Sequence, residues 1–297
     1  MEIYSAILAG LGGMFGWGLS DFFAKKSIDK LGDIRTLLWA QIFGILPAVL
    51  LLVFLPEPVN LGLNILFFLF AFAIGDCAGF LFFYKGLEKG MVSILSPVFA
   101  VQSGVAVLVS ALIFGEQISQ LRWIGLALAF VGVLLISFQP PNKEQKLTLK
   151  NISKGLPETI AGMIIFGFYF PAWDWFLGYQ GSGWIIPGLV ERCFFVAILF
   201  LGIYLLSLKK KEPVRIVAKE GKLWFWLILV GLFDIIAALS TNWGYKFTTL
   251  TSVIVVLMGA FPLVTVVAAR IFLKEKLTKV QIFGVAIIII GTIVLSF

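Results

Sequence analysis

The apolar residues of this chain fall into ten long runs, separated by short stretches of glycine, proline and charged residues. The runs are continuously apolar, and each has about the 20 residues that an α-helix needs to cross a hydrocarbon core of roughly 30 Å. The pattern therefore predicts ten transmembrane helices, at 4–24, 35–55, 62–83, 91–113, 121–139, 157–178, 184–207, 222–243, 250–273 and 280–297.

The composition supports a membrane protein. Hydrophobic residues make up 60% of the chain and charged residues only 13%, whereas soluble proteins carry about 25% charged residues. The net charge of +7 lies almost wholly in the links between the runs, where it faces anionic lipid headgroups rather than a nucleic acid. We therefore expect an all-α integral membrane protein.

Several kinds of chemistry are excluded or disfavoured by the residues that are present. The chain has no histidine, and its two cysteines, Cys77 and Cys193, both lie inside apolar runs. Histidine catalysis is excluded, and a zinc site or a disulfide framework is not expected. No P-loop sequence occurs, which argues against an ATP-driven pump. We therefore expect no metal and no other cofactor.

An internal repeat divides the chain into two parts. Residues 84–138 align without a gap on 243–297, and the alignment superposes Ser93 on Ser252, Glu116 on Glu275, Gly125 on Gly284 and Gly132 on Gly291. We expect a first five-helix repeat at 1–139, a polar linker at 140–156 and a second repeat at 157–297. Because five is an odd number of spans, the second repeat should be inverted relative to the first, as is common in secondary transporters. The glycines seven residues apart should allow close helix packing.

These features resemble the EamA-type branch of the drug/metabolite transporter superfamily. The resemblance rests on the two five-helix repeats, on Gly16-Trp17-Gly18 in the first helix, and on Gly115-Glu116 and Lys274-Glu275, each followed by a glycine-containing helix. It implies transport of small organic solutes and names no substrate. The chain departs from the family pattern at Ser103, the counterpart of Pro262, so the two halves should bend differently.

Five charged residues fall inside the predicted spans: Asp76, Asp174, Glu191, Arg192 and Asp234. A charge inside a membrane is costly, so each is a functional candidate. Asp234 ranks first because a stripe of small and polar residues follows it on one helix face: Ala237, Ala238, Thr241 and Asn242. Asp76 shares a face with Phe80, Phe83 and Tyr84. A buried acid that serves packing alone is the alternative for both.

The remaining candidates have a structural interpretation beside the functional one. Arg192 could neutralise one of the embedded acids, and adjacent Glu191 and Arg192 should contact different partners, since neighbours on a helix face different ways. Asp174 follows Pro171, where the helix could open, and it lies either near the lipid headgroups or in the cavity. Trp17, Trp173 and Tyr84 could stack on a solute, and Glu116 and Glu275 should mark a repeated turn. Asp21 is expected near a helix end, at the membrane interface.

Together these residues predict a secondary transporter that works by alternating access. Four embedded acids against one base favour a cationic or zwitterionic solute, such as an amine or amino acid, and permit proton coupling. Two alternatives stay open, an intramembrane aspartyl protease that uses Asp76 and Asp234, and a non-transporting structural or receptor protein. We expect no enzyme, no nucleic-acid partner and a bacterial or archaeal cytoplasmic membrane; the sequence predicts no oligomeric state.

The basic residues predict the orientation in the membrane. Twenty of the 23 lysines and arginines lie in the odd-numbered links, from Lys25 after the first helix to Lys279 after the ninth. Because an excess of Lys and Arg in short loops marks the cytoplasmic side, these links should be cytoplasmic and both chain ends outside. The family resemblance implies the opposite orientation, and we follow the charges.

Overall fold

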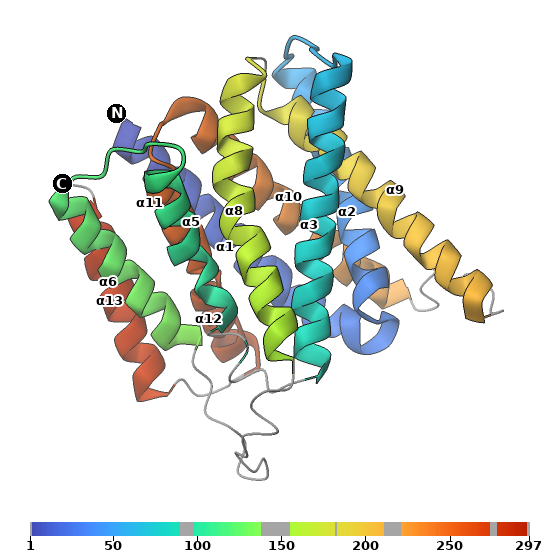
Figure 1. Cartoon of the computed structure of the whole chain (residues 1–297). Helices are drawn as coiled ribbons and strands as arrows, with labels where there is room; N and C mark the ends of the chain where they lie inside the picture. Colours follow the sequence, from blue (N-terminus) through green and yellow to red (C-terminus); the bar gives the residue numbers. More distant parts are fainter. Residues whose placement is uncertain are drawn as a thin grey trace.

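The structure is a computed structural model, and it describes residues 2–89, 95, 98–137, 155–181, 183–210, 221–273 and 278–295. These residues form an all-helical bundle with no strand among them (Figure 1). The helices are α1 (Glu2–Leu31), α2 (Asp33–Phe54), α3 (Leu63–Lys89), α5 (Gln102–Leu112), α6 (Gln120–Ser137), α8 (Leu156–Tyr179), α9 (Ile185–Lys210), α10 (Gly221–Phe247), α11 (Thr251–Gly259), α12 (Phe261–Leu273) and α13 (Lys279–Leu295).

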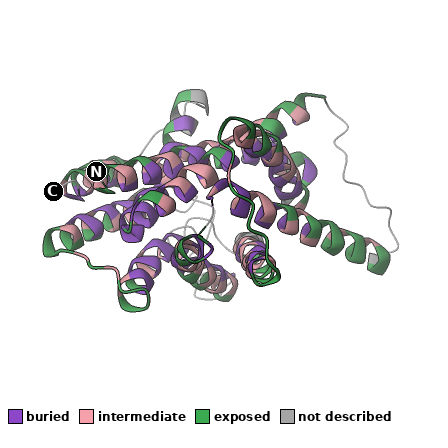
Figure 2. Cartoon of the chain, turned by 90° about the horizontal axis from the view of Figure 1, so that it is seen from above, coloured by how far each residue is buried: buried purple, intermediate pink, exposed green. Residues whose placement is uncertain are grey.

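The prediction of an all-α membrane protein is confirmed. Among the described residues, six helices are long and apolar enough to cross a membrane, and four shorter apolar helices accompany them. Seen from above in Figure 2, the helices turn their buried sides toward one another and many exposed residues outward. Exposed residues include Leu50, Phe67, Phe225 and Ile290, which suit contact with lipid. Ten separate crossings remain a prediction.

Helices from the two parts of the chain pack mainly against each other, with fewer contacts within each part. Helix α1 lies against α10, α11 and α12, while α8 lies against α3 and α5. Helices α6 and α13 lie side by side at one edge of the bundle (Figure 1). The middle of the bundle is therefore lined by both parts of the chain.

The contact between α6 and α13 is made by glycine backbone. A side-chain carbon on Gly132 would lie 2.8 Å from the carbonyl oxygen of Gly284, and one on Gly291 would lie 2.6 Å from the backbone nitrogen of Ala129. Such distances exclude any larger residue without a shift of the backbone. The expectation that these glycines permit close helix packing is confirmed.

Two helices are interrupted at matching positions. The backbone N–H of Val101 donates to the carbonyl of Val98 at 3.2 Å, and that of Ala260 donates to Leu257 at 3.1 Å. Val101 and Ala260 stand 159 residues apart, the same spacing as Ser93 and Ser252. The single helix predicted at 250–273 is therefore two helices, α11 and α12. Pro262 has no N–H to donate to the carbonyl four residues earlier, which explains a break in the second half. The first half is interrupted at Val101 as well, although Ser103 takes the place of the proline there.

Two further helix predictions need correction. Helix α1 does not end at 24: it continues to Leu31, and Gly32, with a φ of 83°, follows it. Asp21 is therefore well inside the helix. Helix α8 does not open after Pro171, because it runs without interruption to Tyr179. The predicted helix 91–113 is described only in part. Of the linker predicted at 140–156, residues 140–154 lie outside the described residues.

The start of α9 is fixed by a carboxylate from the link between α2 and α3. Glu57 accepts hydrogen bonds from the backbone N–H groups of Trp184 at 2.8 Å, Ile185 at 2.9 Å and Ile186 at 3.0 Å. A carboxylate at a helix N-terminus satisfies donors that have no partner within the helix. Gly183 leaves the space for it, since an added side-chain carbon would lie 1.8 Å from the carboxylate. The first turns of α9, which carry Glu191 and Arg192, are thereby held in place.

Candidate functional site

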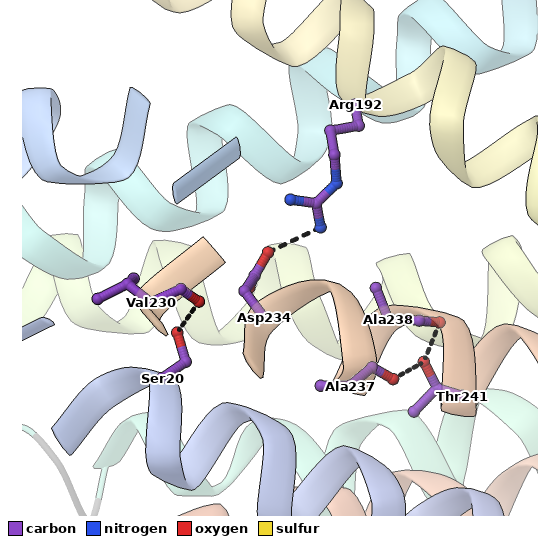
Figure 3. Close-up of polar contacts among 7 residues, drawn as sticks. All are labelled: Ser20, Arg192, Val230, Asp234, Ala237, Ala238 and Thr241. Atoms are coloured by element: carbon purple, nitrogen blue, oxygen red, sulfur yellow. Dashed lines mark hydrogen bonds and ion pairs between the residues drawn. The ribbon is translucent and has the colours of Figure 1, made fainter. Parts of the chain in front are cut away.

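Four charged side chains meet in the middle of the bundle, and we call them the central charge cluster: Asp76 of α3, Glu191 and Arg192 of α9, and Asp234 of α10. Arg192 Nη2 donates to Asp234 Oδ2 at 2.7 Å (Figure 3). The side chains are only 6% and 13% exposed, so water screens this ion pair poorly. The sequence left two partners open for Asp234, a solute and a buried base. In the structure Asp234 is paired with the base, Arg192.

The backbone of α2 makes the space for the guanidinium. A side-chain carbon on Gly44 would lie 2.3 Å from Arg192 Nη1 and 3.0 Å from its Cζ. The guanidinium is thus held between Gly44 on one side and Asp234 on the other. Arg192 Nη1 itself is buried and has no hydrogen-bond partner among the described residues.

Glu191 is adjacent to Arg192 on α9, and the expectation that the two contact different partners stays a prediction. Glu191 is buried, and its Oε1 has no hydrogen-bond partner among the described residues. The charges of Asp76, Arg192 and Asp234 all act on it. Asp76 is partly exposed and is within electrostatic reach of Asp234 and Arg192. The cluster therefore holds three acids, one base and two polar atoms that could bind a ligand or water.

The stripe that follows Asp234 packs against neighbouring helices. An added side-chain carbon on Gly16 of α1 would lie 2.6 Å from Ala237 Cβ. The hydroxyl of Thr241 donates to the carbonyls of Ala237 and Ala238 in its own helix (Figure 3). The small residues serve close contact between α1 and α10, which sets the position of Asp234.

Asn242 joins three elements through its amide. Its Oδ1 accepts a hydrogen bond from Trp173 Nε1 of α8 at 2.8 Å, and its Nδ2 donates to the carbonyl of Trp184 at 3.2 Å. Both residues were candidates for contact with a solute, and in this structure each uses its polar group inside the protein. The pair fixes α8 and α10 beside the start of α9.

A second group of acids lies at the end of the bundle where α11 begins. Thr251 donates a hydrogen bond to Asp174, and Ser252 donates to Glu116 through its hydroxyl and, at 2.9 Å, through its backbone N–H. Gly115, with a φ of 73°, turns the chain so that Glu116 reaches α11. Burial raises the pKa of Glu116, and its hydrogen bonds to Ser252 oppose this shift. Asp174 thus lies apart from the central charge cluster.

The aromatic candidates have different outcomes. Trp17 is partly exposed, and its ring centroid lies 6.0 Å from that of Phe170 in α8. The side chain of Tyr84 lies outside the described residues, as do Ser93 and Glu275. A groove of about 360 Å³ between α3 and α8 is apolar, and its lining includes Phe68, Phe72, Gly75 and Tyr169. It adjoins Asp76 along the chain and contains no member of the central charge cluster.

Sequence analysis missed one acid of the interior, Asp21. Its charge and that of Asp234 act on each other, and Asp21 is exposed. The signal was its spacing of four residues from Trp17, which places both on one face of α1. Among the described residues no group of histidine, cysteine and acidic side chains is arranged to hold a metal ion.

Comparison with known proteins gives a family and a fold. A family model described as the EamA-like transporter family matches the chain twice, at residues 4–138 and 154–297. One solved crystal structure is similar over 98% of this chain and 96% of its own, with a TM-score of 0.78 and 18% sequence identity. At that identity the likeness concerns the fold alone. No curated protein matches this chain.

Proposed function

Because this chain belongs to the EamA-like transporter family, we propose that it is a secondary transporter of small organic solutes that works by alternating access. The family consists of membrane transporters, and the apolar helices make the chain an integral membrane protein. The observation that carries the proposal is the central charge cluster, which gathers Asp76, Glu191, Arg192 and Asp234 among helices of both parts of the chain.

The packing of the helices supports an inverted repeat. The contact of α1 with α10 has its counterpart in that of α8 with α3, and the contact of α2 with α10 corresponds to that of α9 with α3. Helices α6 and α13 pair with each other. The helix breaks at Val101 and Ala260 occupy the same register. A bundle that repeats in this way can exchange the conformations of its halves and so open to either side.

The charges of the cluster favour one class of solute. Three acids surround one base, so an ammonium group of an amine or amino acid would find carboxylates, and a solute carboxylate would find the unpartnered Arg192 Nη1. A sugar phosphate or nucleotide sugar would need further buried basic residues. Protons can be coupled through the same acids.

The alternative of an aspartyl protease is less well supported. That chemistry needs two carboxyl groups that share a proton, whereas Asp234 forms an ion pair with Arg192. A structural or receptor protein would leave unexplained why charges are buried where both parts of the chain meet. We propose that the protein lies in a bacterial or archaeal cytoplasmic membrane, and the charges of the links favour an orientation with the chain ends outside.

The test is a thermal-shift screen of the purified protein against amino acids, polyamines, nucleobases and aromatic cations, because a ligand that binds the folded state raises the unfolding temperature. We expect a shift with an amine-bearing compound, loss of that shift in Asp76→Asn, and loss of its uptake into proteoliposomes. Glu2→Gln removes an acid at the start of α1 and should retain both. Shifts with anionic compounds alone would contradict the proposal.

Asp234→Asn needs a second variant beside it. We expect it to abolish transport, but it also leaves Arg192 buried without a partner, which costs about 3 to 5 kcal/mol. The double variant Asp234→Asn/Arg192→Gln removes both charges and should unfold at a higher temperature than the single variant while still failing to transport. Transport at the wild-type rate by a folded double variant would exclude the ion pair from the site.

A further inference from the structure

Asp21 is an interior acid that the ion pair between Arg192 and Asp234 does not use. Helix α1 continues from Asp21 to Leu31, a length of about 15 Å. Asp21 is exposed, while its chain neighbours Ser20 and Phe22 are buried. Among the side chains that the structure describes, none forms a hydrogen bond or ion pair with its carboxylate, and the side chain of Lys25, one turn further along α1, is not described. An exposed carboxylate so far from the helix end needs a source of water.

The face of α1 that carries Asp21 looks into the bundle. Trp17 lies one turn earlier on that face and packs against Phe170 of α8. The residues that mark the lipid side of α1, exposed Tyr4, Leu8 and Phe15, lie on another face. Because a carboxylate facing lipid would be costly, the exposure of Asp21 is best explained by water that enters the bundle from the end where α1 stops.

Asp21 is held close to the central charge cluster by its neighbour on the helix. Ser20 Oγ donates to the carbonyl of Val230 in α10 at 3.1 Å, one turn before Asp234 (Figure 3). The described charged side chains on the helices packed against α1 are Arg35 of α2 and Lys222, Asp234 and Lys246 of α10, and the side chain of Arg270 in α12 is not described. Of these described groups, Asp234 is the one whose charge acts on Asp21.

The interior acids differ in their partners and in their exposure. Asp234 is bound to Arg192 at 2.7 Å. Glu191 is buried deeper, and its Oε1 has no partner among the described residues. Asp21 alone of these three is exposed. Asp76 is partly exposed. Asp21 is therefore the most open of the four acids to a proton that arrives from water, and binding it would relieve the repulsion between Asp21 and Asp234.

We propose that Asp21 exchanges protons between the water at the Leu31 end of α1 and the central charge cluster, and thereby carries the coupling proton of transport. The step is reversible binding of one proton to the carboxylate, and Asp234 stays paired with Arg192. The proposal rests on the proposed function, because a coupling proton has meaning only in a transporter.

The first experiment follows proton binding without any solute. Infrared spectra of the full-length protein in lipid nanodiscs are recorded over a pH series, and the carbonyl band of protonated carboxyl groups is measured in wild type, Asp21→Asn and Glu2→Gln. We expect Asp21→Asn to lose one titrating band that Glu2→Gln retains. An identical series of spectra in wild type and Asp21→Asn would overturn the proposal.

The second experiment measures transport in proteoliposomes with a solute found in the thermal-shift screen. A positioned proton-transfer group is worth about a hundredfold in rate, so Asp21→Asn should accumulate about a hundredfold less solute under a pH gradient. It should still exchange solute near the wild-type rate without a gradient, and Asp21→Glu should restore accumulation. Accumulation at the wild-type level in Asp21→Asn, or equal loss of accumulation and exchange, would overturn the proposal.

The two experiments separate this proposal from the one on which it rests. If wild-type vesicles neither accumulate nor exchange any compound of the screen, the proposed transport function fails. If exchange is present and the infrared band is unchanged in Asp21→Asn, transport stands and the role of Asp21 is refuted.

Discussion

At the scale of single residues, the position of the Arg192 guanidinium depends on the absence of a side chain at Gly44. A buried guanidinium needs a countercharge and space, and here Asp234 supplies the first and Gly44 the second. Removing one partner of a buried pair is costly because the remaining charge stays away from water. The glycine of α2 is thus as necessary to the ion pair as the carboxylate.

We predict that Gly44→Ala lowers both the stability of the folded protein and its rate of transport. The new methyl group would lie 2.3 Å from Arg192 Nη1, so the end of the Arg192 side chain must shift. We expect the shift to weaken the ion pair with Asp234, and its complete loss would cost about 3 kcal/mol. Thermal unfolding in detergent measures the loss. Gly202→Ala in α9 is the matched control, since no atom lies within 4 Å of a carbon added there. Equal unfolding temperatures for the two variants would refute the role of Gly44.

The sequence predicted which residues belong to the central charge cluster, but it did not predict which of them contact each other. Asp76, Glu191, Arg192 and Asp234 stand out because charges inside apolar runs are rare. Which acid pairs with Arg192 does not follow from the chain, because Asp234 lies 42 residues away and the crossing of α9 and α10 decides it. For Asn242 the predicted role was wrong in another way. Its polarity suggested contact with a ligand, whereas its side-chain amide forms hydrogen bonds with Trp173 and Trp184.

At the scale of helices, apolar length predicted where helices lie and failed to predict where they are interrupted. A run such as 250–273 stays apolar through the break at Ala260, so hydropathy carries no mark of it. Pro262 indicated a break in one half. In the other half the helix is interrupted at Val101, although Ser103 stands where Pro262 stands in the second half. The end of α1 was missed for the reverse reason, since Lys25 and Lys26 end the apolar run while the helix continues to Leu31.

The glycine contact between α6 and α13 gives a prediction of its own. In Gly291→Ala the added carbon would lie 2.6 Å from a backbone nitrogen of α6, which cannot yield as a side chain can. We expect a loss of about 1 to 3 kcal/mol in the free energy of unfolding, as for other overpacked contacts. Denaturation of the variant beside Gly178→Ala, where nothing lies within 4 Å, makes the comparison. A Gly291→Ala variant as stable as this control would show that the two helices separate easily.

At the scale of the whole molecule, the start of α1 and the end of α13 lie on the same side of the bundle (Figure 1). The positions of the basic residues predict that this side faces away from the cytoplasm. A Ser153→Cys substitution in a variant without Cys77 and Cys193 tests the orientation. We expect a membrane-impermeant maleimide to label it only after the cells are opened. Labelling in intact cells would mean that the chain is inserted the other way.

The packing of α1 on α10 and of α8 on α3 also bears on how such a chain could have arisen. Residues 2–137 alone would carry Asp76 into the membrane without Arg192, and their first helix would lack the surface that Gly16 packs against. A half-length ancestor with the same helices would have found that packing surface only on a second copy of itself. Gene fusion would then have joined two subunits that already depended on each other, after which each copy was free to acquire different charges.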